Sequence, residues 1–531
     1  MSRTSLIWHT VRHLKPRQIL YQVLNRLRQK PRLRLHAKVP PGTPLTNQPA
    51  TNELVANQPP TWQGQTVTLL NQAVTFADGI DWNYAANGKL WTYNLNYFDF
   101  LNQSGLPPEQ GLALIRDFIR QTDTLTDGLE PYPTSLRILN WVHFLLRHTI
   151  QDETIDRHLY AQVKLLRSRL EYHLGANHLL ENGFALLTSA VYFRQRVWLR
   201  QAASLLVREL AEQILPDGGH YERSPMYHQI LLDRLLDAYQ LLNTDTWHAT
   251  PELSLLLAGT AARMLGWLDA ITFANGDIPY LNDAAPGIAP TTQQLRHKAG
   301  RVGVQPVPVT LRESGYRKLR AGAMELVANV GSVGPAYQPG HAHADTFSLV
   351  LYVNNQPIVV DLGTSTYQID ERRSLERSTA AHNTVEVAGQ NSSEVWGGFR
   401  VARRASVTRL VETGTSLSAQ HDGYRRLGLL HERTWQVEPG KLIITDRLLR
   451  TGRDGVEAAG VARLYFHPAV VVTAYEDYFQ AGPLSVTFEG GKIGKGIVQP
   501  YEMADGFNRR RPAQCLLVSF RETLITTITV T

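Results

Sequence analysis

Residues 340–363 read GHAHADTFSLVLYVNNQPIVVDLG, and AAHNTVEV follows at 380–387. Apolar residues fill the stretches on both sides of the Asn-Asn pair, which predicts two β-strands joined at that pair. In an extended chain His341 and His343 point to the same face, because side chains alternate with period two. The stretch therefore places two imidazoles together in a region that is otherwise predicted to be β-sheet.

Two further candidate metal ligands lie nearby in the sequence. Asp361 ends the second apolar run, and a third histidine, His382, lies in the AAHNTVEV segment. Two imidazoles and a carboxylate suit zinc and leave it an open coordination position. A simple hairpin would leave Asp361 about 20 Å from His343, at ~3.3 Å per residue. A shared metal site therefore requires the chain to bend at the Pro-Gly pair before His341 instead of continuing the strand.

The size and composition set broad limits. At 531 residues the chain exceeds the usual size of one domain. With 43% hydrophobic and 19% charged residues, its composition is that of an ordinary globular protein. No apolar run approaches the ~20 residues that a membrane-spanning helix needs. Cys515 is the one cysteine, so an intramolecular disulfide is excluded.

The positive charge is concentrated at the start of the chain. The formal net charge is +7, and the segment from Arg3 to Lys38 is rich in Lys and Arg and has no Asp or Glu. We interpret this segment either as a basic, partly ordered arm or as a region attracted to a polyanion. An acidic polysaccharide or a membrane surface fits that second interpretation, whereas nucleic acid is disfavoured because no nucleic-acid-binding motif follows. Basic residues interrupt every apolar core near the start, so no signal peptide is predicted.

The first half of the chain has a helical pattern. From about residue 108 to 270, apolar residues recur at three- and four-residue spacing, with short intervening loops. Successive helices of this length form antiparallel hairpins and can close into a ring, so an α/α toroid is expected. The predicted helices cover 109–122, 134–149, 156–174, 178–194, 198–215, 225–242 and 251–270.

The second half has a strand pattern, which follows a Gly- and Pro-rich segment at 270–312 that is expected to be a linker. Many short strands separated by turn residues predict an antiparallel β-sandwich. The expected architecture is therefore α+β and multidomain: a basic arm and loop (1–64), an α/α toroid (65–300) and a β-sandwich (301–531). The predicted strands cover 324–330, 346–353, 357–361, 383–388, 405–411, 430–436, 441–447, 461–466, 483–488 and 514–530.

A first polar cluster in the helical half is NHLLENG, at 177–183. On a helix, Asn177, His178 and Glu181 share one side, because they are three and four residues apart. The leucines between them would face the core. The structural alternative is that Asn177 caps the helix and the other polar residues are solvated.

A second cluster is DGGHYERSPMYH, at 217–228. Ser followed by Pro predicts a helix start, with Ser224 as the cap. Tyr227 then lies in the first turn, where the helix dipole favours a phenolate that can exchange a proton. The alternatives are a buried Tyr227 that only packs the helix entry, or a role for Tyr221, Glu222 or His228 instead.

A third segment, YPTSLRILNW at 132–141, places Arg137 and Asn140 on one helical face. With Trp91 and other aromatic residues, they are candidates for the wall of a sugar-binding cleft, in which Arg137 could hold a carboxylate or sulfate. Ordinary core packing is the alternative for all three residues.

These motifs occur in one order: N-H-x-x-E-N-G, D-G-x-x-x-E-R-S-P-x-Y-H, H-x-H-A-D, V-D-x-G and H-N-T-V. Together they resemble the heparinase II/III-type polysaccharide lyases, over most of residues 90–470. The resemblance implies an α/α toroid followed by an antiparallel β-sandwich. It also implies β-elimination at a uronic acid, in which the glycosidic bond to C4 breaks without water and leaves a C4–C5 double bond.

The implied reaction needs three functions: neutralising the C5 carboxylate, removing the C5 proton and protonating the leaving oxygen. By its motif, Asn177 resembles the carboxylate neutraliser, with His178 as a helper and Glu181 as a further substrate-binding candidate. Tyr227 resembles the base and acid on one side of the sugar, and His341 resembles a second proton-transfer residue.

The resemblance also implies a metal. His343, Asp361 and His382 resemble the ligands of a structural zinc ion, or another divalent ion, in the β-domain. The ion would brace the loop that carries His341 rather than act on the substrate. The implied partner is an acidic polysaccharide, either glycosaminoglycan-like or a bacterial exopolysaccharide; a second copy of the chain in a homodimer is an additional option. The family is commonly periplasmic, which implies the cell envelope although no signal peptide is evident.

Two rival functions stay open at this point. One is a non-catalytic glycan-binding or assembly protein that keeps the fold. The presence of Asn177, Tyr227 and His341 together argues against it, because binding alone has no need of a base. The other is a zinc-dependent glycan hydrolase that uses metal-bound water.

Overall fold

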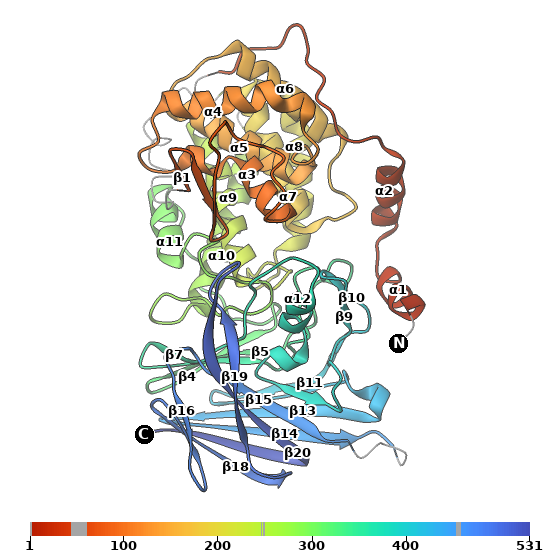
Figure 1. The fold of residues 1–531 in the computed structure, drawn as a ribbon, viewed down its shortest axis with the longest axis vertical. Helices are drawn as coiled ribbons and strands as arrows, with labels where there is room; N and C mark the ends of the chain where they lie inside the picture. The colour runs from red at the N-terminus through yellow and green to blue at the C-terminus, as the bar shows by residue number, and fades with distance from the viewer. Residues whose placement is uncertain (1–2, 44–60, 246, 248–249, 453–457) are drawn as a thin grey trace.

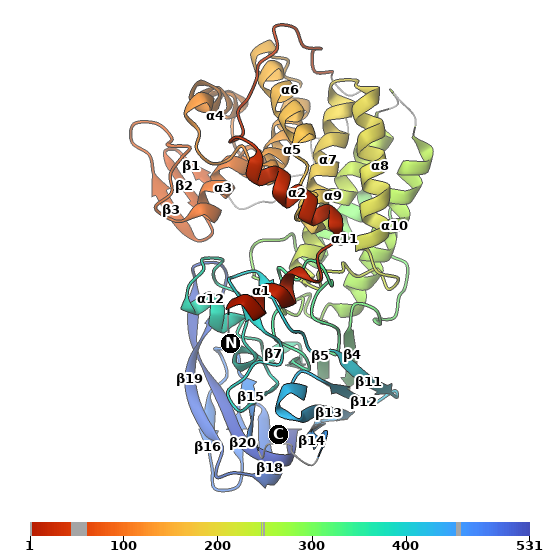
Figure 2. The same cartoon turned by 90° about the vertical axis from the view of Figure 1, so that its right-hand side faces the viewer.

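The computed structural model describes residues 3–43, 61–245, 247, 250–452 and 458–531. A helical domain and a β-domain are stacked end to end (Figures 1 and 2). The helical domain, orange to green in the figures, precedes the β-domain, cyan to blue, in the chain. The predicted fold class, helices followed by antiparallel sheet, is thus confirmed. Within the described residues, no helix is both long and apolar enough to cross a bilayer.

The helical domain is an incomplete α/α toroid with an inner and an outer row. Its helices are α3 (Lys89–Tyr97), α4 (Pro108–Gln121), α5 (Pro131–Arg147), α6 (Glu153–Ser168), α7 (Ala176–Tyr192), α8 (Arg196–Gln213), α9 (Pro225–Thr244), α10 (Pro251–Ile271) and α11 (Thr292–Arg301). The odd-numbered helices contact one another in sequence as the inner row, and the even-numbered helices flank them. Because α5 and α7 are covered on both sides, almost all their residues are buried.

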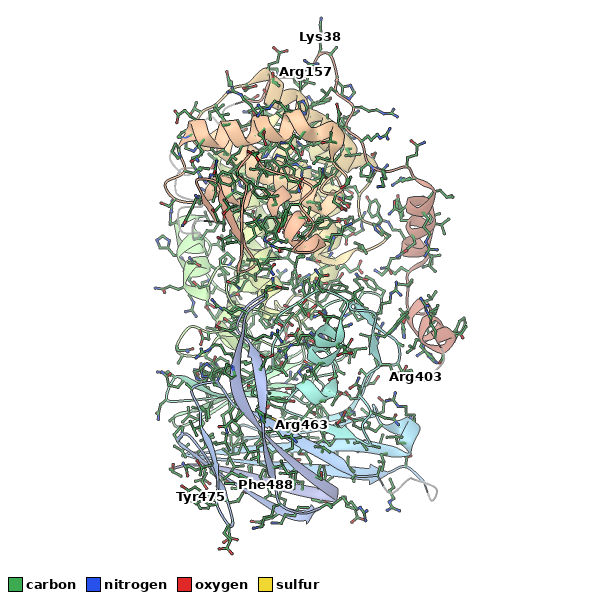
Figure 3. The ribbon with its side chains drawn as sticks, in the orientation of Figure 1. Lys38, Arg157, Arg403, Arg463, Tyr475 and Phe488 are labelled. Atoms are coloured by element: carbon green, nitrogen blue, oxygen red, sulfur yellow. The ribbon has the colours of Figure 1, made fainter. Side chains whose placement is uncertain are left out.

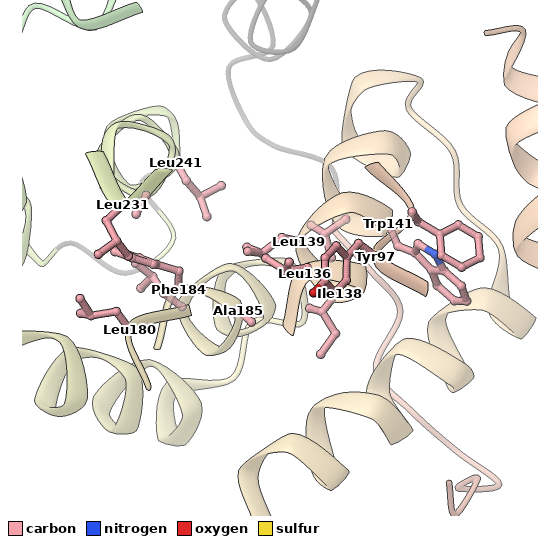
Figure 4. Close-up of a cluster of buried hydrophobic side chains, with 14 of the residues drawn as sticks. Tyr97, Leu136, Ile138, Leu139, Trp141, Leu180, Phe184, Ala185, Leu231 and Leu241 are labelled. Carbon is pink, nitrogen blue, oxygen red and sulfur yellow. The ribbon is translucent and has the colours of Figure 1, made fainter. Parts of the chain in front are cut away.

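Apolar side chains of the inner row form the core of this domain. Figure 4 shows them from α3, α5, α7 and α9, among them Tyr97, Leu139, Phe184 and Leu231. Burying one such side chain contributes about 1.5–3 kcal/mol. The helices therefore form through the packing of their apolar faces, which the three- and four-residue spacing predicted.

The outer layer of the β-domain is a large antiparallel sheet. Its central path runs β11-β12-β13-β14-β20-β18-β17-β16, and the long strand β20 also pairs with β15 and β19, while β8 pairs with β15. The strands are β8 (Val385–Val387), β11 (Val407–Glu412), β12 (Ser416–His421), β13 (Leu429–Glu438), β14 (Lys441–Arg450), β15 (Gly460–Tyr465), β16 (Val472–Ala474), β17 (Phe479–Ala481), β18 (Leu484–Lys492), β19 (Ile497–Ala504) and β20 (Arg510–Val530).

A four-stranded sheet forms the middle layer of the molecule. It contains β4 (Tyr316–Ala321), β5 (Met324–Asn329), β6 (Leu349–Val353) and β7 (Gln356–Val359), in that order. Leu326 and Leu351 point into the core shared with the large sheet. Their neighbours Val327 and Val350 pack on the other face against Trp267 of α10. Both faces of the central strands are covered, so every residue of β5 and β6 is buried, and the two domains share a packed junction.

The hairpin between β6 and β7 decides whether the predicted metal ligands can meet. Asn354 and Asn355 both have positive φ, 50° and 63°, as a tight hairpin turn requires. β6 begins only at Leu349, three residues later than predicted, so residues 341–348 leave the strand as a loop. The required bend is therefore present.

Several elements were not predicted. The arm, expected to be only partly ordered, contains helices α1 (Arg3–Val11) and α2 (Pro16–Leu27), while residues 44–60 of the expected arm and loop lie outside the described residues. The expected linker contains α11, whose start at Thr291 has a capping box with Gln294. The remaining short elements are β1 (Trp62–Gln63), β2 (Thr66–Leu69), β3 (Gln72–Thr75), α12 (Glu371–Glu376), β9 (Val395–Trp396) and β10 (Arg400–Val401).

Candidate active site

The predicted catalytic residues meet where the helical domain faces the β-domain. His178 lies in the first turn of α7, Tyr227 in the first turn of α9, and His341 in the loop before β6. Ser224 caps α9, because its Oγ accepts a hydrogen bond from the Tyr227 N–H at 3.3 Å, and Pro225 follows as the first helical residue. The predicted Ser-Pro helix start is confirmed.

Tyr227 and His341 form the centre of this site. Their rings are stacked, with centroids 3.9 Å apart and planes 8° apart. The hydroxyl of Tyr367 lies 3.1 Å from the Tyr227 hydroxyl, and its ring is nearly parallel to that of His341. Tyr367 was not predicted, since no motif distinguishes it in the sequence. Because Tyr227 and His341 come from different domains, the site depends on the junction.

Burial controls the protonation of this pair. It raises the pKa of Tyr227 well above its ordinary value, and the neighbouring Tyr367 raises it further. Burial also lowers the pKa of His341 to about 3. Near neutral pH the phenol therefore keeps its proton and the imidazole is uncharged. The expected Tyr227 phenolate is wrong for this structure, because desolvation outweighs the helix dipole.

Glu222 is a buried carboxyl beside the stacked rings. Its Oε1 lies 3.4 Å from Nδ1 of His341, and its Oε2 has no hydrogen-bond partner among the described residues. Burial raises the pKa of Glu222 to about 8, although a hydrogen bond from the Asn177 backbone acts in the opposite direction. The carboxyl is thus largely protonated at neutral pH and can donate a hydrogen bond to an anion. From the sequence, Glu222 was considered only as an alternative to Tyr227 for the catalytic role.

The NHLLENG residues line the start of α7. His178 Nδ1 lies 3.1 Å from Oε1 of Glu171, and this carboxylate raises the pKa of His178 against the effect of burial. The His178 side chain is 31% exposed, which makes it the accessible edge of the site, while Asn177 is buried beside it. Glu181 lies deeper, 3.6 Å from Arg234 Nε, and burial raises its pKa to about 7.

Arg137, Asn140 and Trp91, predicted to bind substrate, are buried in the helical domain. The Arg137 guanidinium donates to the Gln162 side chain at 2.8 Å and to two backbone carbonyls. Asn140 and Trp91 likewise donate to backbone carbonyls. These contacts support the core-packing alternative, so the proposed site omits the three residues.

The three predicted metal ligands come together in the β-domain. Nδ1 of His382 lies 2.7 Å from Oδ2 of Asp361, and the His343 and His382 ring centroids are 5.3 Å apart. Nε2 of His343 lies 2.8 Å from Oδ1 of Asp283. The other ring nitrogens, His343 Nδ1 and His382 Nε2, are buried and have no hydrogen-bond partner in the part of the chain that the structure describes.

Two buried imidazole nitrogens that lack hydrogen-bond partners within the described ranges could bind a cation. Metal-binding histidines usually donate their other ring N–H to a carboxylate, and here Asp361 and Asp283 lie beside the second nitrogen of each ring. The fit is limited to the two histidines, however. As placed, the described side chains form no group of three or more His, Cys, Asp or Glu in a ligating arrangement.

A buried ion pair that the sequence did not reveal supports the loop that carries His341 and His343. The carboxylate of Asp283 accepts two hydrogen bonds from the Arg373 guanidinium, one of them at 2.7 Å, as well as the contact from His343. Arg373 lowers the pKa of Asp283, which stays ionised despite its burial. Asp283 lies in the segment expected to be a linker. It is far from Arg373 in the sequence, so no local pattern predicted that the two side chains pair.

Glu222→Gln is expected to change how stability depends on pH. In the folded state burial raises the pKa of Glu222 from 4.5 to about 8. The folded carboxyl therefore keeps a proton that the unfolded one releases, so its contribution to stability is complete below pH 4.5 and is lost as the pH rises through about 8. Denaturant unfolding at about pH 5 and about pH 9 should show the wild type losing stability relative to the variant. Parallel pH profiles would mean that folded Glu222 is already ionised.

Two family descriptions match the chain. Residues 134–299 match Heparinase II/III N-terminus, and residues 305–531 match Heparinase II/III-like, C-terminal. The first match ends within α11 and the second begins before β4, where the domains join.

Curated relatives are similar to parts of the chain. The heparin-sulfate lyases of Bacteroides stercoris and Pedobacter heparinus are 22% identical over 317 residues and 25% identical over 218 residues. These matches cover 54% and 36% of this chain but only 45% and 32% of the relatives, so the chain spans less than half their length. FtsZ-localized protein C of Caulobacter vibrioides is 28% identical over 251 residues, which cover 44% of this chain and 41% of that protein.

Solved structures resemble most of the chain. A heparinase III structure matches with a TM-score of 0.65 and 16% identity, and covers 86% of this chain and 80% of its own. The heparan sulfate lyase HepC from Pedobacter heparinus matches with a TM-score of 0.53 and 15% identity, covering 96% and 87%. At these identities the similarity shows the fold, a toroid followed by a β-sandwich, as predicted.

Proposed function

The chain belongs to the heparinase II/III-like family, and on that basis we propose that it is a polysaccharide lyase that cleaves a uronic-acid-containing polysaccharide by β-elimination. The observation that carries the proposal is the stacked pair of Tyr227 and His341, which joins a proton donor from one domain to a proton acceptor from the other. The substrate is an acidic polymer, either glycosaminoglycan-like or a bacterial exopolysaccharide.

The protonation states of Tyr227 and His341 indicate which side chain accepts a proton and which donates one in the proposed reaction. The neutral imidazole of His341 can accept the C5 proton, and the protonated phenol of Tyr227 can donate a proton to the leaving oxygen. The C5–H electrons then form the C4–C5 double bond as the C4–O bond breaks. Transfer of the proton from His341 back to Tyr227 restores both groups, and no water is consumed.

The C5 proton is removable only if the uronate carboxylate is neutralised. We assign this neutralisation to Asn177 and His178, at the start of α7, and to the protonated Glu222. His178 carries positive charge more readily than an ordinary histidine, because Glu171 raises its pKa. A protonated acid, an amide and an imidazolium can all donate hydrogen bonds to a carboxylate.

The test of this function is the ultraviolet absorbance of the protein incubated with a panel of uronate-containing polysaccharides. A rise caused by the C4–C5 unsaturated uronate would establish elimination and identify the substrate class. New reducing ends without that absorbance would indicate hydrolysis, including the zinc-dependent kind, and refute the lyase proposal.

We also propose a structural zinc ion, or another divalent ion, held by His343 and His382, with Asp361, the third predicted ligand, supporting His382 through its Nδ1. The two buried, unpartnered imidazole nitrogens support it. When bound, the ion would supply structural bracing by holding the loop of His341 against β7 and the segment before β8, with Asp283 orienting His343. Proton transfer in the proposed reaction stays with Tyr227 and His341.

Chelation should therefore lower the melting temperature of the protein, and added zinc should restore it. His343→Ala should melt at the lower temperature and respond to neither treatment. A melting temperature that chelation leaves unchanged, in protein whose metal content falls, would show that no ion braces this loop. Elemental analysis of the purified protein completes the test.

A non-catalytic assembly protein is the second candidate. It is favoured by the similarity to FtsZ-localized protein C, a relative whose name describes where it localises rather than a reaction. This candidate predicts no unsaturated product from any polymer in the panel. It also predicts that Tyr227→Phe leaves partner binding unchanged.

A further inference from the structure

The basic arm lies along one side of the molecule. α1 and α2 cross the junction of the two domains on the outside of the molecule and are part of neither the toroid nor the sheets (Figures 1 and 2). α1 contacts the β-domain, where Trp396 donates to Thr10 at 3.1 Å and the Arg403 guanidinium, labelled in Figure 3, donates to Ser5. After α2 the arm continues to the far end of the toroid, where Arg157 donates to the backbone carbonyl of His36.

α2 docks on the body of the protein through its polar side chains. Gln18 is buried, and its Nε2 donates to the backbone carbonyls of His173, at 3.5 Å, and Tyr337, at 3.4 Å. Asn25, two turns later, lies 2.9 Å from Nδ1 of His173. Lys15 pairs with Glu212. The face of the helix that usually points to solvent thus points inward.

The apolar side chains consequently point outward. Trp8, Leu20 and Leu27 are 67%, 56% and 79% exposed. On each helix the exposed apolar residues recur at three- and four-residue spacing, so they share one face of that helix. This outward stripe consists of Ile7, Trp8 and Val11 on α1 and Ile19, Leu20, Val23, Leu24 and Leu27 on α2.

Positive charge surrounds the outward stripe. Residues 1–43 contain ten Lys or Arg and no Asp or Glu, so they carry +10 in a chain whose net charge is +7, which leaves −3 for the rest. Arg3 on α1 and Arg26 on α2 are exposed, as is Arg12 directly after α1. Just beyond α2, Lys30, Arg32 and Arg34 are exposed as well.

We propose that α1 and α2 bind flat on the surface of a bilayer that contains anionic lipids. An amphipathic helix with an apolar stripe and flanking cations buries the stripe at the boundary between headgroups and acyl chains, while the cations meet the acidic headgroups. Trp8 adds a side chain that favours this boundary. The lyase domain would then face the membrane with the side that carries the arm.

The positive charge and the exposed apolar stripe together favour an anionic bilayer over the other possible binding partners. A second copy of the chain would cover the apolar residues, but it would place two +10 arms against each other. An acidic polysaccharide or a nucleic acid would neutralise the cations, but it would leave eight exposed apolar side chains in water. An anionic bilayer accommodates both features.

Flotation of the full chain with vesicles tests the proposal. The wild type should bind phosphatidylcholine vesicles that contain phosphatidylglycerol, bind pure phosphatidylcholine weakly, and dissociate as salt is added. Trp8→Ser combined with Leu20→Glu and Leu27→Glu should lower the partition coefficient roughly tenfold or more. Replacing Arg3, Arg12 and Arg26 with Gln should lower it by about fivefold per residue. Leu255→Glu is the matched control, since Leu255 is 74% exposed on α10.

Three results would overturn the proposal. Vesicle binding that is absent, or that Leu255→Glu reduces as much as the triple variant does, would exclude the stripe as a membrane surface. A wild type that is dimeric and a triple variant that is monomeric, with no vesicle binding by either, would assign the stripe to a second copy. Binding to heparin or DNA that the triple variant retains, again without vesicle binding, would assign the arm to a polymer. The substituted residues are exposed, so unchanged melting temperatures verify that each variant is folded.

Discussion

Tyr227→Phe should lower the turnover number by roughly 10²–10⁴-fold, which is the usual contribution of a positioned proton donor. The variant keeps the ring that stacks on His341 and loses only the hydroxyl that we propose as the donor to the leaving oxygen. Its melting temperature and its affinity for the polymer should therefore stay close to those of the wild type. Initial rates of ultraviolet absorbance on the best substrate of the panel, with binding measured separately, give the comparison.

Two tyrosines provide controls for this variant. Tyr367→Phe removes the hydroxyl 3.1 Å from that of Tyr227 and should give a smaller loss of turnover, because it changes only the environment of the donor. Tyr475→Phe, at a half-exposed position in the β-domain (Figure 3), should have no effect. Undiminished turnover of Tyr227→Phe would assign the leaving-group proton to another residue.

Asp283→Ala should destabilise the protein by about 3–5 kcal/mol, the usual cost of leaving a buried charge without its partner. Arg373 would lose both carboxylate oxygens, and His343 would lose the group that orients its ring. Both charged side chains are almost completely buried, so water cannot replace the lost contacts. Denaturant unfolding measures the loss, provided the transition stays cooperative.

The surface pair of Arg509 and Asp505 gives the matched comparison. Its arginine side chain is 56% exposed, so Arg509→Gln should cost less than about 1 kcal/mol. Replacing the buried pair together, as Asp283→Leu with Arg373→Met, should recover part of the loss, because no buried charge then lacks a partner. Equal stability losses for Asp283→Ala and Arg509→Gln would refute a structural role for the buried pair.

The sequence predicted the elements whose periodicity decides their structure. The seven predicted helices are present, each shifted by only a few residues, because each buries an apolar face against a neighbour in the toroid. The predicted strands are present for the same reason, and in β6 uninterrupted apolar residues reflect a sheet that is covered on both faces.

Other features lay beyond sequence reasoning because they depend on contacts between distant segments. Nothing local places Tyr367 beside Tyr227, or Asp283 beside Arg373. The protonation state of Tyr227 was mispredicted because the sequence shows the helix start but not the depth of burial. The helices of the arm were not predicted, because α2 buries polar residues and exposes apolar ones, which is the reverse of the usual pattern.

A single glutamine touches both domains at once. Gln18 donates to the carbonyl of His173, just before α7, and to that of Tyr337, in the loop that leads to His341. A hinge rotation at the junction would slide the ring of His341 off that of Tyr227, since each belongs to a different domain. Gln18 opposes this rotation because its side chain is hydrogen-bonded to a backbone carbonyl in each domain. The alignment of the Tyr227 and His341 rings is therefore maintained partly from outside the candidate site, by the helix that carries Gln18.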